Sequence, residues 1–394
     1  MSAAPTTTAA RVLRVGLSTT TAEPALTGGR LDGMGVYSRA LLEHLPQAGA
    51  EVLPFSFPSP GAAERLTVGR ALPLSFPLAT LGNLLLPSSV HMNISRLAGK
   101  DAPPLDLFHA TDYRIVRMDC PVVATLHDAV PIAHPEWCKP RLRGLKNWLQ
   151  IQAARRAQHV ITGSHYSIRE LVECFGVDQR KISVVHHGVR PEWFEAPAAE
   201  ARDATLAHYG LTAGYFLFVG TLQPRKNVGR LLEAYLALPP VLRAARQLVI
   251  VGASGWLSDE LVAQIKAAGQ RGENVIWLNQ LTDDAQLHHL YAGAGAFIFP
   301  SLHEGFGLPL VEAFASGVPV ATSNATSLPE VAQGAALEFD PLSVPEITAA
   351  MTTLARDDAL RQRCIAAGHR RALELTWDAA ARRTVAVYQQ VLSN

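Results

Sequence analysis

Short runs of β-branched and aromatic residues alternate with longer amphipathic stretches along most of this chain. In the first half the runs fall at 12–17, 51–57, 105–110, 122–127, 160–164 and 182–187. After about residue 190 the pattern starts again, with runs at 215–220, 247–252, 274–279, 296–301 and 318–323. Strands separated by helical stretches are typical of parallel sheets joined by helical crossovers. The sequence therefore predicts an α/β protein built from two doubly wound, Rossmann-like halves.

The length of 394 residues is enough for two or three domains, each with its own core. A segment at 190–214 carries Pro, Ala and Gly between the two sets of strands and lacks the apolar pattern of a core element. We therefore expect an N-terminal domain over residues 1–190 and a second domain over 191–372. Beyond residue 340 the periodic apolar positions predict helices to the end of the chain.

The charge balance and the spacing of the cysteines argue against several kinds of partner and site. Lys plus Arg number 35 and Asp plus Glu number 34, so no overall field would attract a polyanion and we expect no nucleic-acid partner. The four cysteines form no Cys-x-x-Cys pair, which argues against a zinc site and a disulfide framework and favours a reducing, cytoplasmic setting. No run approaches the roughly 18 apolar residues of a membrane-spanning helix, and the N-terminus has no signal-peptide pattern. We expect a cytoplasmic protein, soluble or peripheral to a membrane.

The most informative stretch is FIFPSLHEGFGLPLVEAFASGVPVATS, residues 297–323. A strand is expected to end near Pro300, and a glycine-containing loop then leads to a helix, with Pro309 suited to its first position. The free N–H groups of a helix start can receive a phosphate. Glu304 and Glu312 flank this helix start, and a carboxylate can accept two hydrogen bonds from a diol. Alternatively, Glu312 complements the helix dipole and Glu304 is a solvated loop acid.

This stretch resembles the donor-site signature of the retaining glycosyltransferases of family 4. The resemblance implies that Glu304 contacts the sugar of a nucleotide-sugar donor and that Glu312 contacts the ribose hydroxyls. It also implies that backbone amides around Phe306, Gly307 and Leu308 meet the sugar or the phosphates. The match is specific over about 20 residues and, with the segments below, covers most of the chain.

A second motif, FVGTLQPRKNVGRLLEAY at 218–235, places Arg225 and Lys226 between a strand and a helix. Two adjacent cations suit a diphosphate that gains negative charge as it leaves, although a solvated basic turn is the alternative. By resemblance they bind the donor diphosphate. Many family members have Gly-Arg-Leu where this chain has Gly220, Thr221 and Leu. Thr221 cannot supply that charge, and the resemblance implies that Arg225 replaces it. The Pro-Arg-Lys-Asn variant is most similar to mannosyltransferases and related enzymes of bacterial polysaccharide assembly.

In the N-terminal half, Gly33 and Gly35 lie in a glycine-rich loop that follows the first strand and opens a helix. They allow close backbone approach to a phosphate, but a simple tight turn explains them equally well. The family resemblance implies a loop that closes over the donor phosphates and approaches the acceptor. A nicotinamide-dependent oxidoreductase is a rival on this fold, but Ser38 stands where its third glycine would be.

The strand at 122–127 delivers His127 and Asp128 to its carboxyl end. A His–Asp pair that pins a loop is the structural alternative. By resemblance, a histidine at this strand end lies beside the transferred sugar. A later segment resembles the family's Asn-Gly-Val-Asp sequence, with His187 in place of Asn and Arg190 in place of Asp, which leaves the roles of both open.

The stretch 139–158 is rich in Lys and Arg, contains no acidic residue and has Leu and Trp at helical spacing. It is either a peripheral contact with an anionic membrane face or a packed helix with a solvated basic side.

The resemblance as a whole implies the GT-B fold, two Rossmann-like domains facing a cleft, with the helix at 373–394 returning to the N-terminal, acceptor-side domain. It implies a retaining transfer of a hexose, above all mannose from GDP-mannose, to a glycan or lipid-linked acceptor, with no metal and no resident cofactor. UDP- or dTDP-sugar donors and a non-catalytic nucleotide-sugar-binding protein are the alternatives. The implied catalytic residues are His127, Arg225, Lys226 and Glu304, and the implied donor-binding residues are Gly33, Gly35, Gly220, Thr221, Leu281, Phe306, Gly307, Leu308 and Glu312.

Overall fold

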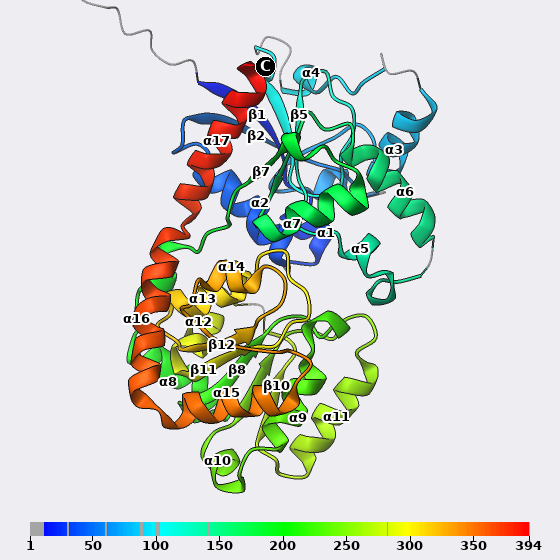
Figure 1. The fold of residues 1–394 in the computed structure, drawn as a ribbon. Coiled ribbons are helices and arrows are strands. Elements are labelled where there is room, and N and C mark those ends of the chain that lie inside the picture. Colours follow the sequence, from blue (N-terminus) through cyan, green and yellow to red (C-terminus); the bar gives the residue numbers. More distant parts are fainter. Residues whose placement is uncertain are drawn as a thin grey trace, which may run out of the picture. The chain divides into compact units, whose positions relative to one another are not determined.

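The computed structural model describes residues 12–29, 31–59, 61–86, 90–98, 103–140, 142–281 and 283–393 (Figure 1). Two parallel sheets form its framework. One has seven strands in the order β3-β2-β1-β4-β5-β6-β7, and the other has six in the order β10-β9-β8-β11-β12-β13. Strand order reverses next to β1 in one sheet and next to β8 in the other, as in doubly wound folds. The predicted α/β class with two Rossmann-like sheets is confirmed.

The strands of the first sheet coincide with the predicted runs, apart from the short β3. They are β1 (Leu13–Ser18), β2 (Ala50–Ser56), β3 (Arg70–Ala71), β4 (Leu107–Ala110), β5 (Val122–Thr125), β6 (His159–Thr162) and β7 (Ile182–Val184). The helices of this part of the chain are α1 (Pro24–Thr27), α2 (Gly33–His44), α3 (Phe76–Leu85), α4 (Ile94–Ala98), α5 (Val130–Ala133), α6 (Arg143–Ala154) and α7 (His165–Glu170).

The strands of the second sheet also follow the predicted runs, and only the three-residue β13 was missed. They are β8 (Tyr215–Val219), β9 (Leu248–Val251), β10 (Val275–Leu278), β11 (Ala294–Phe299), β12 (Val320–Ser323) and β13 (Leu337–Phe339). The helices are α8 (Ala199–His208), α9 (Val228–Leu236), α10 (Pro240–Ala245), α11 (Asp259–Gln270), α12 (Asp284–Gly293), α13 (Leu308–Ala315), α14 (Leu328–Ala332), α15 (Val344–Arg356), α16 (Asp358–Glu374) and α17 (Trp377–Ser393).

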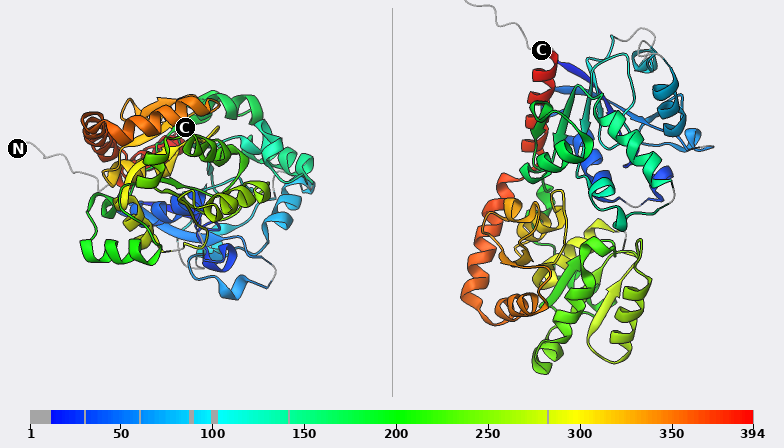
Figure 2. Two further views of the ribbon diagram at one scale, coloured as in Figure 1. Left: turned by 90° about the horizontal axis from the view of Figure 1, so that it is seen from below. Right: turned by 45° about the vertical axis from the view of Figure 1, so that its right-hand side comes forward.

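The second sheet is buried because helices lie on both of its faces, with α9 and α11 on one side and α12 and α13 on the other (Figure 2). Its central strands are continuous apolar runs, such as YFLFV in β8 and AFIF within β11, whose side chains are almost wholly buried. A parallel strand covered on both faces needs such a run. Polar residues therefore gather where these strands end, in the loops described below.

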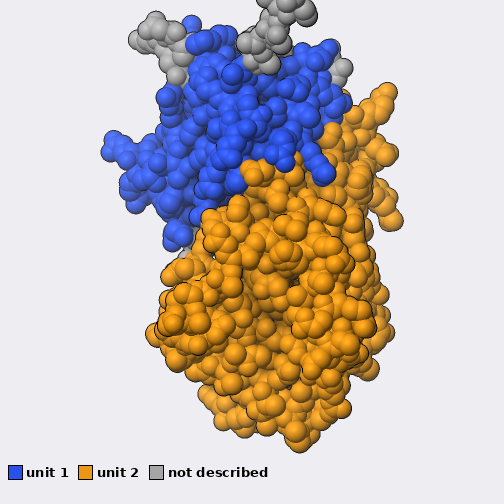
Figure 3. All heavy atoms as spheres, turned by 90° about the vertical axis from the view of Figure 1, so that its left-hand side faces the viewer, with its two compact units in different colours: residues 1–125, 156–160, 381–394 blue, residues 126–155, 161–380 orange. Residues whose placement is uncertain are grey.

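The chain divides into two compact units, which Figure 3 colours separately. Unit 1 comprises residues 1–125, 156–160 and 381–394, and unit 2 comprises 126–155 and 161–380. This division groups 126–155 and 161–190 with the second sheet, whereas the sequence analysis placed them in a domain ending at residue 190. The expected boundaries at 190 and 372 stay predictions.

Within unit 1, α17 is fixed to the sheet by a buried polar cluster. Tyr388 of α17 contacts Nδ1 of His109 through its hydroxyl at 2.6 Å, and Nε2 of His109 contacts Oγ1 of Thr125 at 2.8 Å. The hydroxyl of Tyr37 on α2 also reaches Thr125 Oγ1, at 2.8 Å. Buried polar groups need such partners, and here three elements supply them. In the part of the chain that the structure describes, no helix combines the length and apolar character needed to cross a membrane.

Candidate active site

Two neighbouring strands of the second sheet, β8 and β11, end in loops that bind each other through the backbone. The N–H of Leu302 donates to the carbonyl of Arg225 at 2.7 Å, and the side-chain amide of Asn227 donates to the carbonyl of Pro300 at 3.0 Å. Carboxyl ends of adjacent parallel strands meet at one edge of a sheet, which is where ligands bind in open α/β folds. The two motifs identified in the sequence therefore lie side by side in unit 2.

Arg225, Lys226 and Glu304 form one ion-paired cluster at this edge. Lys226 Nζ lies 2.5 Å from Glu304 Oε1, and Arg225 Nη1 lies 2.9 Å from Glu304 Oε2. Arg225 Nη1 also donates to the carbonyl of His303 at 3.0 Å. The structure thus brings together three of the four residues predicted to be catalytic and gives one carboxylate two cationic partners.

Burial and charge act against each other in this cluster. Burial alone would raise the pKa of Glu304, but the charges of Lys226 and Arg225 and the hydrogen bond from Lys226 lower it to about 2. Burial lowers the pKa of Lys226 to about 8, against the opposing pull of Glu304. Its ammonium also lies 5.1 Å from the ring centroid of Phe299, a favourable cation–π distance. The cluster carries one net positive charge and is suited to an anionic ligand.

The backbone around Glu304 is held by hydroxyl groups and by a close backbone contact. The N–H of Glu304 donates to Oγ1 of Thr326 at 3.1 Å, and Oγ of Ser327 donates to the carbonyl of Glu304 at 2.9 Å. A Cβ added to Gly305 would lie 2.0 Å from the carbonyl oxygen of His127. Only glycine fits there, and its contact brings His127 directly beside the Glu304 loop.

His127 is the fourth predicted catalytic residue, and it lies among other rings. Its Nδ1 is 3.3 Å from Nε2 of His187, whose own ring lies near Phe306 and stacks on Trp377. Burial, with the nearby charges of His127 and His186, lowers the pKa of His187 well below its usual value. His187 is therefore a neutral, buried support for His127 at neutral pH.

Glu312 has different neighbours from Glu304. It lies on α13, where the hydroxyl of Tyr291 donates to its Oε2 at 3.1 Å. Burial raises the pKa of Glu312 to about 7, while this hydrogen bond and Arg190 pull the value down. The structure groups Glu312 with Tyr291, Arg190 and Asp284 rather than with the ion-paired cluster. No sequence pattern indicated a role for Tyr291, which lies on α12 and is buried in the core.

The other predicted donor-binding residues of unit 2 lie in the segments that follow β8, β10 and β11. Gly220 follows β8 with φ +156°, and a Cβ on it would lie 3.6 Å from Cε of Lys226. Gly307 precedes α13 with φ +99°, a conformation that favours glycine, and Leu308 is the first residue of the helix. Phe306 is buried beside His187. Thr221 is exposed, and Leu281 is half-buried against the core.

Gly33 and Gly35 belong to unit 1, at the start of α2. Asp32 caps this helix by accepting a hydrogen bond from the N–H of Gly35 at 2.9 Å. A Cβ on Gly35 would lie 2.6 Å from the carbonyl oxygen of Thr21, so the chain's own packing already requires glycine there. Packing against Thr21 therefore accounts for a glycine at position 35, and the phosphate contact of Gly33 and Gly35 stays a prediction.

Two groups of side chains with the donor atoms to hold a metal ion lie in the described part of unit 2. One consists of His134, Glu170 and His303, and the other of His165, His186 and Glu330. Neither has a sequence signature, because the members of each group come from segments far apart in the chain. In the second group Glu330 already accepts hydrogen bonds from the backbone N–H of His165, at 2.8 Å, and from that of Tyr166, at 3.0 Å.

Comparisons with known proteins bear on the family and the fold of this chain. The family described as "Glycosyl transferases group 1" matches residues 210–371, and "Glycosyltransferase Family 4" matches residues 31–193. An O-antigen chain mannosyltransferase B from Escherichia coli is 32% identical over 72% of this chain and 74% of the relative. An MMP alpha-(1->4)-mannosyltransferase from Mycolicibacterium hassiacum is 29% identical over 71% of this chain and 68% of the relative. The sucrose-phosphate synthase structure from Thermosynechococcus elongatus superposes with a TM-score of 0.72 at 20% identity, covering 97% of this chain and 99% of that one.

Proposed function

This chain belongs to glycosyltransferase family 4 and has the GT-B fold, and we propose that it transfers mannose from GDP-mannose to a glycan or lipid-linked acceptor. The observation that carries the proposal is the cluster of Arg225, Lys226 and Glu304, because it offers two cations fixed at a sheet edge. The names of the similar mannosyltransferases support the choice of sugar. The Pro-Arg-Lys-Asn sequence that supplies both cations supports it as well.

The proposed chemistry needs no metal. As the bond between the sugar C1 and the diphosphate oxygen breaks, the diphosphate gains negative charge, and Arg225 and Lys226 stabilise it. The N–H groups at the start of α13 add further donors, since Gly307 opens the helix. Two fixed cations and a helix dipole thereby supply the stabilisation that a bound divalent ion would otherwise provide.

The acceptor oxygen forms its bond to C1 on the face that the diphosphate leaves, so the anomeric configuration is retained. The acceptor hydroxyl loses its proton to the departing phosphate oxygen, which keeps atoms and charge balanced. Glu304 is ion-paired with Lys226 at 2.5 Å and with Arg225 at 2.9 Å. It therefore holds these two cations in place and contacts the sugar, and it does not act as a nucleophile. His127, held by His187, contacts the transferred sugar.

Glu312 holds the ribose of the donor in this proposal. Its raised pKa, about 7, means that the carboxyl group is partly protonated near neutral pH. A partly protonated carboxyl group can both donate to and accept from a vicinal diol. Tyr291 fixes its orientation from α12, through a hydrogen bond of 3.1 Å.

The reaction is tested with purified protein, GDP-mannose and a short mannose-containing acceptor, followed by NMR of the product's anomeric proton. We expect an α-linked product in the presence of EDTA, with UDP-glucose and dTDP-glucose giving less than a tenth of the rate. Lys226→Ala and Glu312→Ala should both abolish turnover, whereas Glu233→Ala, a change at an exposed position of α9, should not. Complete inhibition by EDTA, an inverted product or a preference for another nucleotide would overturn the corresponding part of the proposal.

A non-catalytic nucleotide-sugar-binding protein is the alternative that these experiments exclude. Such a protein would bind GDP-mannose and be stabilised by it, yet release no GDP with or without acceptor. Slow hydrolysis of GDP-mannose in the absence of acceptor, lost in Lys226→Ala, would establish catalysis even before the natural acceptor is known.

We also propose that α6 contacts the inner, cytoplasmic face of a membrane that carries anionic lipids. Leu142, Leu145 and Trp148 are 64%, 54% and 43% exposed and recur at helical spacing, with Lys146 among them. Residue 141, also part of the basic stretch 139–158, lies outside the described residues. The protein should cosediment with phosphatidylglycerol vesicles and not with phosphatidylcholine vesicles. Leu145→Ser/Trp148→Ser should lose this binding, and equal binding to both vesicle types would contradict the proposal.

A further inference from the structure

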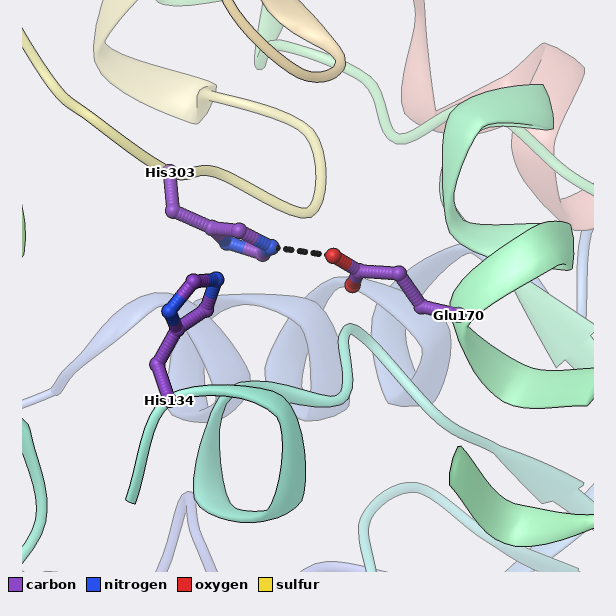
Figure 4. A group of neighbouring side chains, drawn as sticks. All are labelled: His134, Glu170 and His303. Carbon is purple, nitrogen blue, oxygen red and sulfur yellow. Dashed lines mark hydrogen bonds and ion pairs between the residues drawn. The ribbon is translucent and has the colours of Figure 1, made fainter. Parts of the chain in front are cut away.

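A second group of polar side chains lies next to the Glu304 loop but takes no part in the proposed transfer. His134 follows α5, Glu170 ends α7, and His303 immediately precedes Glu304. Figure 4 shows the three side chains pointing toward one another from these three segments. Nε2 of His303 lies 2.7 Å from Oε1 of Glu170, and the rings of His134 and His303 are 5.3 Å apart at their centroids.

The donor set is that of a transition-metal site. One nitrogen or oxygen atom from each residue lies within 4.8 Å of the other two. In a tetrahedral zinc site with bonds of about 2.0–2.1 Å, ligand atoms are roughly 3.3 Å apart, so small side-chain rotations would bring all three to an ion. Two imidazoles and one carboxylate favour Zn²⁺ and its neighbours over Mg²⁺, which prefers oxygen ligands.

Residues around the group orient two of the three ligands as metal sites require. Nδ1 of His134 lies 3.2 Å from Oε1 of Glu136, which leaves Nε2 of His134 for an ion. The ring of Trp137 stacks on His134 with centroids 4.1 Å apart, and the hydroxyl of Tyr166 donates to Oε1 of Glu170 at 3.2 Å. Each neighbour restricts one ligand side chain to the orientation that faces the other two.

The buried members of the group keep polar atoms that the protein does not satisfy. His303 is 1% and Glu170 9% exposed, yet Oε2 of Glu170 and Nδ1 of His303 have no hydrogen-bond partner among the described residues. An unpaired buried oxygen costs free energy, and an ion bound to this carboxylate would offset that cost. The His134 side chain is 35% exposed, which gives an ion a route in and leaves room for a water ligand.

We propose that His134, Glu170 and His303 bind one divalent ion of the zinc class, with its fourth position open to water. The ion would tie the loop that carries Glu304 to α7 and to the segment after α5. This role is structural, and the site is distinct from the cations that hold the donor diphosphate. The sequence predicted no metal because its histidines show no zinc spacing, and Glu170 and His303 are 133 residues apart.

Zn²⁺ binding to EDTA-treated, dialysed protein is measured by equilibrium dialysis without any sugar nucleotide. We expect one Zn²⁺ per chain, with affinity at least about tenfold weaker in His134→Ala and in Glu170→Gln. Mg²⁺ should not compete. His208→Ala, a change at an exposed histidine of α8, is the matched control and should bind as the wild type does. Co²⁺ bound in place of Zn²⁺ should give visible absorption bands that disappear in His134→Ala.

Equal affinity in the wild type, His134→Ala and Glu170→Gln would overturn the proposal. Loss of binding in His165→Ala alone would do so as well, because the ion would then belong to the other group. As a second readout, Zn²⁺ should raise the melting temperature of the wild type and not that of His134→Ala. The two failures are distinguishable. Sugar transfer without Zn²⁺ binding would overturn the metal site alone, and Zn²⁺ binding without sugar transfer would overturn the transferase reaction alone.

Discussion

Glu304 and Glu312 lie on one loop–helix segment, yet their surroundings drive their pKa values in opposite directions. Burial alone would raise both. Lys226 and Arg225 outweigh burial at Glu304 and bring its pKa to about 2, whereas Glu312 has a tyrosine hydroxyl as its nearest partner and its pKa is raised to about 7. The partners that reach each carboxylate from other elements, and not its position in the motif, set its ionisation.

The two environments suit two tasks. A permanently ionised Glu304 holds two like charges close together, so little rearrangement is needed when a diphosphate arrives. A carboxyl group that titrates near neutrality, as Glu312 does, can adjust its hydrogen bonding to a diol. We therefore expect the loss of Lys226 to lower both turnover and stability. Isosteric changes at Glu312 and Tyr291 should instead alter how stability depends on pH.

The largest effect is expected from Lys226→Met, which removes one of the two cations from Glu304. Turnover should fall by about 10²–10³ because one group that stabilises the leaving diphosphate is lost. The free energy of unfolding should fall by about 3–5 kcal/mol because a buried carboxylate loses a partner. Initial rates and urea unfolding measure the two effects.

The double variant Lys226→Met/Glu304→Gln separates these two contributions. It should regain most of the stability but none of the activity. The buried carboxylate is gone, and Arg225 is partly exposed and keeps its hydrogen bond to the carbonyl of His303. If Lys226→Met unfolds like the wild type, the ion pair does not stabilise the loop and the contrast with Glu312 fails.

The second largest effect is expected from Gly305→Ala, because the backbone of His127 occupies the place of the new Cβ. We expect a loss of about 1–3 kcal/mol in stability and a marked loss of turnover, as the Glu304 loop must move away from His127. Gly229→Ala is the matched control, because a Cβ on this α9 glycine meets no atom within 4 Å. That variant should be as stable as the wild type or more so. Equal behaviour of the two variants would show that the loop tolerates displacement.

The sequence predicted that Glu304, Arg225 and Lys226 would lie close together. Strand, loop and helix signals follow one another between 297 and 323, and the cations at 225 and 226 follow the adjacent strand β8. Adjacent strands of a parallel sheet end at one edge, so a chain of local signals was enough to bring these groups together. The two missed strands, β3 and β13, have only two and three residues and carry too little pattern to be recognised.

The sequence predicted Glu312 as a site residue but did not predict which residues surround it. Tyr291 reaches Glu312 from α12, and no local pattern distinguishes its hydroxyl from that of a core tyrosine. The same applies to the contact between Gly305 and His127 and to the group of His134, Glu170 and His303. Such contacts depend on how separate elements pack, which periodicity and spacing do not encode.

A smaller effect is expected from Glu312→Gln, and it should appear as a change in how stability depends on pH. The folded-state pKa of Glu312, about 7, exceeds its usual value of 4.5. Its contribution is therefore complete below pH 4.5 and is lost as the pH rises through 7. The wild type should lose at most about 3 kcal/mol relative to Glu312→Gln across this window. Urea unfolding at pH 4.5, 6 and 8 measures the difference, and parallel curves for the two proteins would mean that Glu312 titrates normally.

The smallest effect is expected from Tyr291→Phe, which removes the hydroxyl that donates to Glu312. That hydrogen bond favours the ionised carboxylate and lowers its folded-state pKa, so its loss should move the upper end of the pH-dependent decline in stability to higher pH. We expect a displacement of less than about one pH unit, equivalent to about 1.4 kcal/mol. Tyr209→Phe is the control, because the hydroxyl of Tyr209 also bonds to α12, at Gln286, 2.7 Å away. Two outcomes would contradict this: a displacement to lower pH, or an equal displacement in Tyr209→Phe. Either would show that the Tyr291 hydroxyl does not favour the ionised form of Glu312. Burial alone would then account for the difference between its pKa and that of Glu304.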